Sequence, residues 1–359
     1  MRNHCTTLAR PSLGLATLPC ILLLLTLLSL PQAGLHGQTV TVQVTDSVGG
    51  SAVGAGFVVV LDSAGREVRR VLTMSDGTFR IALPGPGQYQ LRSERIGYRS
   101  ATTAPIPAPA DLDTTVTLAV ARLPSMLAPI AVSDSTECVV RPEEGRRVAT
   151  LWEEAMKVLR ATSWTAREGG LAFHVARYSR ELNRNLVTDD EEVDTLLVQS
   201  DQAFSTESPE VLRDQGFVRV VGREVFWEGL DANVMVSSPF LDTHCFRVVA
   251  AERDTTRVGL AFEPVSSRES IPEVAGTLWL DAATAELRTL QFRYVNLRFD
   301  PQRAGGGAEF TRLSDGRWIV WNWWVRIPRL GSFRFGSRAR VRGYREDAAS
   351  VLQVYRFEG

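Results

Sequence analysis

The sequence predicts a mainly β protein, with an N-terminal β-sandwich, one linking helix and a C-terminal curved, half-barrel-like antiparallel β-meander. Three observations predict this fold class. Short apolar runs that alternate with polar residues recur along most of the chain, as half-buried strands require. Pro-Gly and Asp-Gly pairs separate many of these runs, as tight turns require. One long stretch, residues 145–162, has the three-and-four spacing of an amphipathic helix.

The first 37 residues predict export. Arg2 and Arg10 precede an apolar segment of 13 residues, 18–30, and Gly37 stands directly before the first strand-like pattern. This order is typical of a cleaved signal peptide, and we place the cut near Gly37. An uncleaved anchor is the alternative, but a membrane-spanning helix needs about 20 apolar residues. We therefore expect a protein of the periplasm or one associated with the outer membrane.

The charge of the chain argues against one class of partner. Removal of Arg2 and Arg10 reduces 40 basic residues to 38, which face 41 acidic residues, so the mature net charge is −3. Domains that bind nucleic acid are usually strongly basic. No nucleic-acid partner is expected.

Two cysteines, Cys138 and Cys245, remain once the leader is removed. A pair of cysteines in an exported chain predicts a disulfide bond. A metal or redox pair is the alternative. The separation of 107 residues lacks the short spacing of zinc and thioredoxin-type motifs, so we favour the disulfide.

The mature length suggests two domains, because single hydrophobic cores rarely serve more than about 250–300 residues. We assign residues 38–122 to the sandwich, 123–144 to a proline-rich linker, and 145–359 to the helix plus the antiparallel β domain. The helix is expected to pack against the sheet of that second domain. A helix that binds a partner or a membrane surface is the alternative.

A series of motifs in the first domain resembles a known family. The motifs are Val44-Thr45-Asp46, Gly54-Ala55, the TMSDGTF of residues 73–79, the PGQYQL of residues 86–91, and Ile96-Gly97-Tyr98. In this order they resemble the carboxypeptidase regulatory-like domain of bacterial proteins, a transthyretin-like β-sandwich. The resemblance implies a non-catalytic module of the kind often appended to exported and outer-membrane proteins.

The second domain carries a weaker resemblance. Residues 276–281, followed by 287–294, are similar to the repeated hairpin of periplasmic lipoprotein-carrier proteins. That family forms a curved half-barrel that wraps a helix around an apolar cavity. The resemblance therefore implies an apolar ligand or a lipidated partner.

Aromatic residues of the meander are candidates for lining such a cavity. They are Trp279, Phe292, Trp318, Trp321, Trp323 and Trp324. Side chains alternate along a strand, so Trp318 and Trp324 are expected on one face and Trp321 and Trp323 on the other. Burial of both faces in a core is the simpler interpretation, and a ligand cavity on one face is the functional one.

The sequence shows no recognisable catalytic constellation. A metallocarboxypeptidase needs two histidines and a glutamate around zinc. Only His174 and His244 remain in the mature chain, and neither begins a His-x-x-Glu or His-Glu-x-x-His motif. Asp242, His244 and Cys245 form a local cluster that could hold a metal. An ordered loop beside the disulfide is the simpler interpretation, so we expect no metal and no cofactor.

These observations favour a non-enzymatic exported binding or interaction protein of the cell envelope. Its C-terminal domain is expected to hold an apolar ligand or a lipidated partner. One alternative is an accessory module that docks on an outer-membrane complex. Another is a hydrolase that uses Asp242 and His244.

Overall fold

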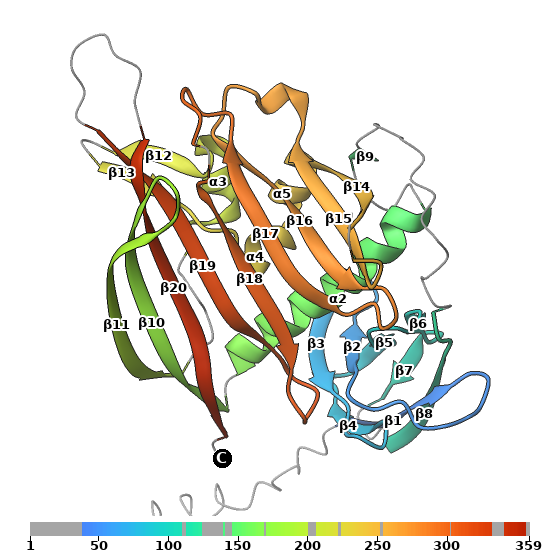
Figure 1. Ribbon diagram of the computed structural model, residues 1–359. Coiled ribbons are helices and arrows are strands. Elements are labelled where there is room, and N and C mark those ends of the chain that lie inside the picture. Colours follow the sequence, from blue (N-terminus) through green and yellow to red (C-terminus); the bar gives the residue numbers. More distant parts are fainter. Residues whose placement is uncertain are drawn as a thin grey trace, which may run out of the picture. The chain divides into compact units, whose positions relative to one another are not determined.

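The computed structural model describes residues 38–109, 113–123, 139–140, 146–168, 170–199, 206–221, 224–251, 254–301, 303–331 and 341–356 (Figure 1). The predicted leader, most of the predicted linker and Cys138 lie outside the described residues. Within the described residues, strands dominate and form several mainly antiparallel sheets, none of them closed. The predicted mainly β fold class is confirmed.

The N-terminal part is a sandwich of two sheets. One sheet has the strand order β4-β1-β8, and the other has the order β3-β2-β5-β6 with β7 paired to β5. The strands are β1 (Thr39–Asp46), β2 (Phe57–Leu61), β3 (Glu67–Leu72), β4 (Thr78–Ala82), β5 (Gly87–Glu94), β6 (Ala101–Thr102), β7 (Ile106–Ala108) and β8 (Asp113–Val120). Buried side chains of Val40, Val42, Val58, Val60 and Leu91 fill the layer between the sheets. Valine suits this layer because its branched side chain packs well on a pleated surface.

The predicted Asp-Gly turn between β3 and β4 depends on glycine. Gly77 has φ = +76°, which residues with a Cβ rarely adopt. A Cβ at Gly77 would also lie 2.7 Å from the carbonyl oxygen of Val44. Asp76 stabilises the turn by accepting a hydrogen bond of 2.9 Å from the backbone N–H of Thr78.

Helix α2 (Arg146–Glu168) lies between the sandwich and the large sheet in the sequence and includes residues 146–162 of the predicted helix. Its apolar side is buried in the same cluster as Phe57 and Ile96 of the sandwich. The helical members of this cluster are Leu151, Trp152, Ala155, Met156, Val158, Leu159 and Ala161.

A buried ion pair also fixes α2 to the sandwich. Lys157, the only lysine of the chain, donates hydrogen bonds to Glu154 Oε1 at 2.5 Å and to the carbonyl oxygen of Tyr98 at 2.7 Å. The backbone N–H of Gly97 donates to Glu154 Oε2 at 2.7 Å. Burial raises the pKa of Glu154, which Lys157 opposes. The pair satisfies sandwich backbone groups that the helix would otherwise leave unpaired.

The large sheet has ten strands in the order β11-β10-β20-β19-β18-β17-β16-β15-β14-β9 (Figure 1). Its strands are β9 (Val139–Val140), β10 (Leu171–Asn183), β11 (Thr188–Val198), β14 (His244–Ala250), β15 (Arg257–Pro264), β16 (Glu273–Asp281), β17 (Leu287–Val295), β18 (Gly305–Arg312), β19 (Trp318–Leu330) and β20 (Val341–Arg356). From β14 to β20, each strand pairs antiparallel with the next in sequence. The predicted meander is thereby confirmed.

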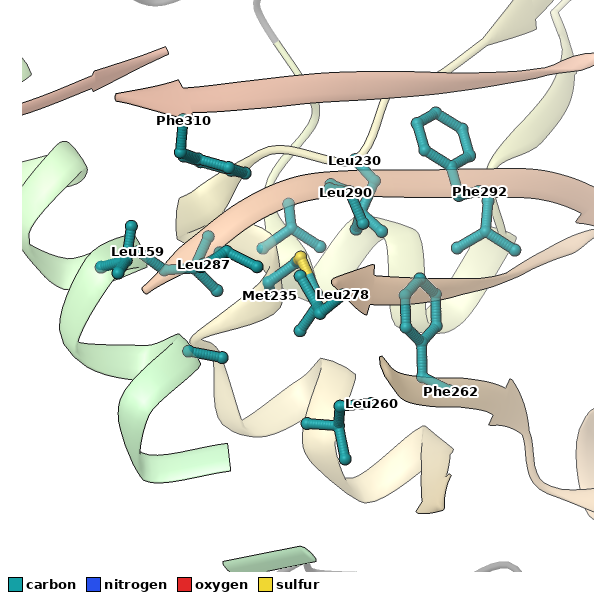
Figure 2. Close-up of a cluster of buried hydrophobic side chains, with 14 of the residues drawn as sticks. Leu159, Leu230, Met235, Leu260, Phe262, Leu278, Leu287, Leu290, Phe292 and Phe310 are labelled. Atoms are coloured by element: carbon teal, nitrogen blue, oxygen red, sulfur yellow. The ribbon is translucent and has the colours of Figure 1, made fainter. Parts of the chain in front are cut away.

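Helices cover one face of this sheet. They are α2 together with three short helices, α3 (Pro209–Gln215), α4 (Ala232–Met235) and α5 (Ser238–Thr243). Figure 2 shows Leu159 of α2 and Met235 of α4 beside Leu278, Leu290 and other apolar side chains of the sheet. A separate two-stranded ribbon, β12 (Val218–Val221) and β13 (Glu224–Trp227), lies between α3 and α4 in the sequence.

A β-bulge in β19 changes the expected alternation of the tryptophans. Glu309 of β18 pairs with Asn322, but the next residue, Phe310, pairs with Val320, so Trp321 is an extra residue. A bulge of this kind reverses the faces of the residues beyond it. The expectation that Trp318 and Trp324 share a face is therefore wrong.

Candidate binding face of the large sheet

The large sheet has a second face, opposite the helices, which we call the outer face. Leu278 on β16 and Leu290 on β17 point into the core. The alternate residues therefore point the other way. Thr277 pairs with Gln291, and Gln291 pairs with Gly307 on β18, so these three residues share the outer face.

The first hollow of the outer face, which we call hollow A, lies at one end of β14–β17 and has a volume of about 690 Å³. It is lined by Cys245, Glu263, Pro264, Val265, Ser266, Glu269, Ala275, Arg293, Val295 and Asn296. This volume falls within the range of about 300–1,000 Å³ typical of small-molecule sites.

Charged side chains line hollow A. Glu263 forms an ion pair of 2.8 Å with Arg247. Arg293 is exposed and has no ion pair among the described residues. Its guanidinium group therefore keeps all five N–H donors for water or a ligand.

A second hollow, which we call hollow B, has a volume of about 360 Å³ and lies toward the other end of the same strands. It is lined by Thr256, Arg257, Asp281, Arg288, Thr289, Glu309 and Phe310. Burial alone would raise the pKa of Asp281, but hydrogen bonds from Thr284 and Ala283 hold the pKa of this carboxyl below its usual value. Asp281 therefore stays ionised at neutral pH.

Trp279 lies on the outer face between the two hollows. Its ring reaches over Gly259 of the neighbouring strand, where a Cβ would lie 2.8 Å from the indole. Trp279 pairs with Thr289 of hollow B. From Glu263 in hollow A to Arg257 in hollow B, the chain advances six residues along β15, which corresponds to about 20 Å at ~3.3 Å per residue. The two hollows therefore follow one another along the strands with the indole between them, and we call this arrangement the polar track.

An aromatic and charged cluster lies on the same face, toward β20. Trp324 pairs with Gly307, and the guanidinium of Arg326 lies 4.7 Å from the centroid of the Trp324 ring. Glu346 accepts hydrogen bonds from both Arg326, at 2.5 Å and 2.9 Å, and Arg180, at 3.2 Å. These contacts hold Trp324 and its neighbours in place.

The structure does not bring the six predicted cavity residues together. Trp318 and Phe292 belong to the core, with 1% and 6% of their surface exposed. Trp279 and Trp324 lie on the outer face, and Trp321 is 38% exposed at the bulge. Trp323 pairs with Ala308, which packs against the core.

A buried polar cluster lies on the core side of the sheet. His244 Nε2 is 3.1 Å from the carbonyl oxygen of Val274 and 3.6 Å from Glu273 Oε2. Arg268 donates to Glu273 Oε1, whereas Oε2 has no hydrogen-bond partner. Burial lowers the pKa of His244 to about 4 and raises the pKa of Glu273 to about 7.

The buried polar cluster contains His244, which the sequence analysis named together with Asp242 as the residues of an alternative hydrolase. The His244 side chain is 1% exposed, and its Nδ1 lies 3.1 Å from the carbonyl oxygen of Phe240. The Asp242 residue is exposed. The glutamate beside His244 is Glu273, which is 29 positions away in sequence, and no spacing pattern indicated it.

The predicted Cys138–Cys245 disulfide stays a prediction, because Cys138 lies outside the described residues. Cys245 pairs with Val140, two residues after Cys138. Among the described residues, no group of three His, Cys, Asp or Glu side chains is arranged to hold a metal ion. No helix in that part of the chain is long and apolar enough to span a membrane.

Comparison with models of protein families gives a match in the sandwich, whose strands β1 to β8 contain the motifs noted above. Residues 39–121 match the model of the carboxypeptidase regulatory-like domain. This regulatory-like domain is non-catalytic, and the match agrees with the resemblance found in the sequence. It covers the sandwich and leaves α2 and the large sheet outside.

Comparison with curated proteins finds no match. Among solved structures, one similar chain is a candidate carbohydrate binding protein from Bacteroides uniformis ATCC 8492, at 10% identity and a TM-score of 0.21, covering 72% of this chain and 96% of that one. Another is a DUF3823 family protein from Bacteroides uniformis ATCC 8492, at 12% identity and a TM-score of 0.20, covering 72% of this chain and 97% of that one. TM-scores this low support no argument about function.

Proposed function

We propose that this chain is a non-enzymatic binding protein of the cell envelope that holds a carbohydrate chain on the outer face of its large sheet. The observation that carries the proposal is the polar track of hollow A, Trp279 and hollow B. Two separate hollows on one set of strands suit an elongated ligand better than a compact one. An indole between them supplies an apolar contact in polar surroundings.

Carbohydrates combine the two properties that this track offers to a ligand. A sugar ring has a C–H face that packs on an aromatic ring, and its hydroxyl groups hydrogen-bond to planar polar side chains. Trp279 offers the aromatic surface, and Gln291, Arg293 and Glu309 offer amide, guanidinium and carboxylate groups. Gln291 and Arg293 are exposed on the same face of β17.

An apolar ligand on the core side is supported less well. In the part of the chain that the structure describes, buried side chains pack together between the sheet and the helices, among them Leu159, Met235 and Phe262 (Figure 2). The hollow beside Glu273 under α3 and α5 has a volume of about 10 Å³, which is at the lower limit for holding one water molecule. A lipid would have to displace the core itself.

The non-enzymatic part of the proposal has two supports. The regulatory-like domain is non-catalytic. In the large domain, the ring nitrogens of His244 face the carbonyl oxygens of Phe240 and Val274 in a buried site. General acid–base chemistry needs its histidine within hydrogen-bond reach of a substrate. The envelope location rests on the predicted leader.

Calorimetric titration tests the proposal, using the oligosaccharides that the protein selects from a glycan array. We expect Trp279→Ala to weaken binding about twofold to tenfold, because an aromatic contact contributes about 0.5–1.5 kcal/mol. Arg293→Ala should also weaken binding. Tyr355→Ala is the matched control, because Tyr355 is 40% exposed and lines neither hollow.

Two results would overturn the proposal. One is that the array contains no carbohydrate that the protein binds. The other is that Trp279→Ala and Arg293→Ala bind as tightly as Tyr355→Ala.

A further inference from the structure

A second tryptophan of the outer face, Trp324, repeats the arrangement of Trp279. The ring of Trp279 reaches over Gly259 of the neighbouring strand, where a Cβ would lie 2.8 Å from it. The ring of Trp324 reaches over Gly307 in the same way, with Nε1 2.8 Å from the position of a Cβ. A Cβ at either glycine would displace the indole. Each glycine therefore leaves the space that an indole of the outer face occupies.

The Trp324 indole keeps its hydrogen-bond donor for a ligand. No described residue accepts a hydrogen bond from its Nε1, and this nitrogen is not among the buried atoms that lack a partner. The guanidinium of Arg326 lies 4.7 Å from the ring centroid and donates to Glu346 at 2.9 Å. The ring is thus held in place while its N–H group stays accessible. An indole of this kind offers an apolar surface and one polar group.

A row of paired residues joins the two indoles across the strands. Trp279 of β16 pairs with Thr289 of β17. Thr289 pairs with Glu309 of β18, and Glu309 pairs with Asn322 of β19. Trp324 lies two residues beyond Asn322 and therefore on the same face. The row crosses three strand spacings of ~4.8 Å, so the two indoles stand about 14 Å apart across the strands.

The middle of this row offers hydrogen-bond acceptors. Thr289 and Glu309 line hollow B, which therefore lies between the two tryptophans. Asn322 Nδ2 donates to Glu309 Oε2 at 2.8 Å, and this bond orients both side chains. Glu309 Oε1 and Asn322 Oδ1 accept no hydrogen bond from any described residue. Both oxygens can accept from the hydroxyl groups of a ligand.

We infer that the bound carbohydrate continues from hollow B across β18 and β19 and places a sugar residue on Trp324. This inference rests on the proposed function, because it assigns a further part of the same ligand. The polar track runs along the strands, whereas the row from Trp279 to Trp324 runs across them. The track and the row meet at hollow B, so the ligand turns or branches there. The ligand is therefore an oligosaccharide, since a disaccharide is too short to occupy both.

Calorimetric titration with ligands of two lengths tests the inference. The probes are the longest oligosaccharide that the glycan array retains and the disaccharide that its partial hydrolysis gives. We expect the wild-type protein to bind the oligosaccharide more tightly than the disaccharide. Trp324→Ala should lower the ratio of these two affinities about twofold to tenfold, the usual effect of losing one aromatic contact. Phe226→Ala is the matched control, because Phe226 is 41% exposed on the β12–β13 ribbon, which pairs with no strand of the large sheet in the described chain.

Asn322→Ala is a second variant, which keeps the inference testable if Trp324→Ala does not fold. It removes an acceptor of the row and the donor that orients Glu309. Loss of a hydrogen bond should likewise lower the affinity ratio about twofold to tenfold.

Two outcomes would overturn this inference alone. One is equal affinity of the wild-type protein for the oligosaccharide and the disaccharide. The other is an affinity ratio in Asn322→Ala, and in Trp324→Ala if it has native circular dichroism, equal to that of Phe226→Ala. In either case, weaker binding by Trp279→Ala would still support the proposed function. An array that retains no carbohydrate would overturn the proposed function and this inference together.

Discussion

At the scale of single residues, His244 and Glu273 give the stability of the protein two opposing pH dependences. Burial lowers the pKa of His244 to about 4, so the unfolded state binds a proton more readily than the folded state. The stability that depends on neutral His244 is fully present above about pH 6.5 and is lost as the pH falls toward about 4. Glu273 acts in the opposite sense.

Burial raises the pKa of Glu273 to about 7, so here the folded state binds the proton more readily. The stability that depends on protonated Glu273 is fully present below about pH 4.5 and is lost as the pH rises through about 7. The contributions of His244 and Glu273 to the pH dependence of the free energy of unfolding have opposite signs. They therefore largely cancel between about pH 4.5 and 6.5.

Substitution of one of the two residues should leave only the pH dependence of stability that the other residue causes. We expect the free energy of unfolding of Glu273→Gln to rise by roughly 3 kcal/mol between pH 4 and pH 6.5, because only the His244 slope remains. His244→Gln should show the reverse slope between about pH 4.5 and 7. Urea denaturation across this pH range measures both. His174→Gln, on a half-buried residue of β10, is the control, and a wild-type profile from either variant would contradict this account.

Gly77 and Gly65 allow the cost of a Cβ at a positive φ to be compared with and without a steric clash. Gly77 and Gly65 both have positive φ, +76° and +75°. A Cβ at Gly77 would lie 2.7 Å from the carbonyl oxygen of Val44, whereas a Cβ at Gly65 meets nothing within 4 Å. Gly65→Ala should therefore cost only about 1 kcal/mol of backbone strain.

Gly77→Ala should cost clearly more than Gly65→Ala, by about 1–3 kcal/mol, because it adds a steric clash to the same strain. Chemical denaturation measures both variants. Equal losses of stability would show that the clash is relieved without cost.

At the scale of elements, local chemistry made the sandwich and the hairpins predictable. The turn at Asp76-Gly77 needs only a glycine and an aspartate that are adjacent in sequence. The helix pattern at residues 145–162 is likewise local, and α2 begins at Arg146. These features require no knowledge of which strands are neighbours.

The outer face could not be predicted in the same way, because strand register decides which side chains share a face. The alternation of side chains along a strand predicted that Trp318 and Trp324 lie on one face, but the bulge at Trp321 puts them on opposite faces. One signal was present in the sequence. Gly259 and Gly307 lack side chains where Trp279 and Trp324 lie, but only the register shows that these glycines and indoles are neighbours.

At the scale of the whole molecule, the contacts of α2 should make the sandwich and the large sheet unfold together. Glu154 and Lys157 are both buried and hydrogen-bond to the backbone of Gly97 and Tyr98. Removal of one member of such a pair leaves a buried charge, which typically costs about 3–5 kcal/mol. We expect a single calorimetric transition for the wild-type protein.

Lys157→Met should lower the stability of the whole unit by about this amount. Arg66→Met is the control, because Arg66 forms only an exposed ion pair with Asp62. Two separate transitions in the wild-type protein would show that the sandwich and the sheet unfold independently. An unchanged midpoint for Lys157→Met would show that the ion pair does not contribute to stability.

The proposed carbohydrate ligand lies along the outer face of the large sheet, at Trp279. Fluorine NMR of protein labelled with fluorotryptophan can locate this ligand, with the signals of Trp279 and Trp318 assigned from Trp→Phe variants. Addition of an oligosaccharide chosen from the array should shift the Trp279 signal and leave that of Trp318, which is buried in the core, unchanged. A shift of the Trp318 signal with none at Trp279 would place the ligand on the core side and rule out binding at the outer face.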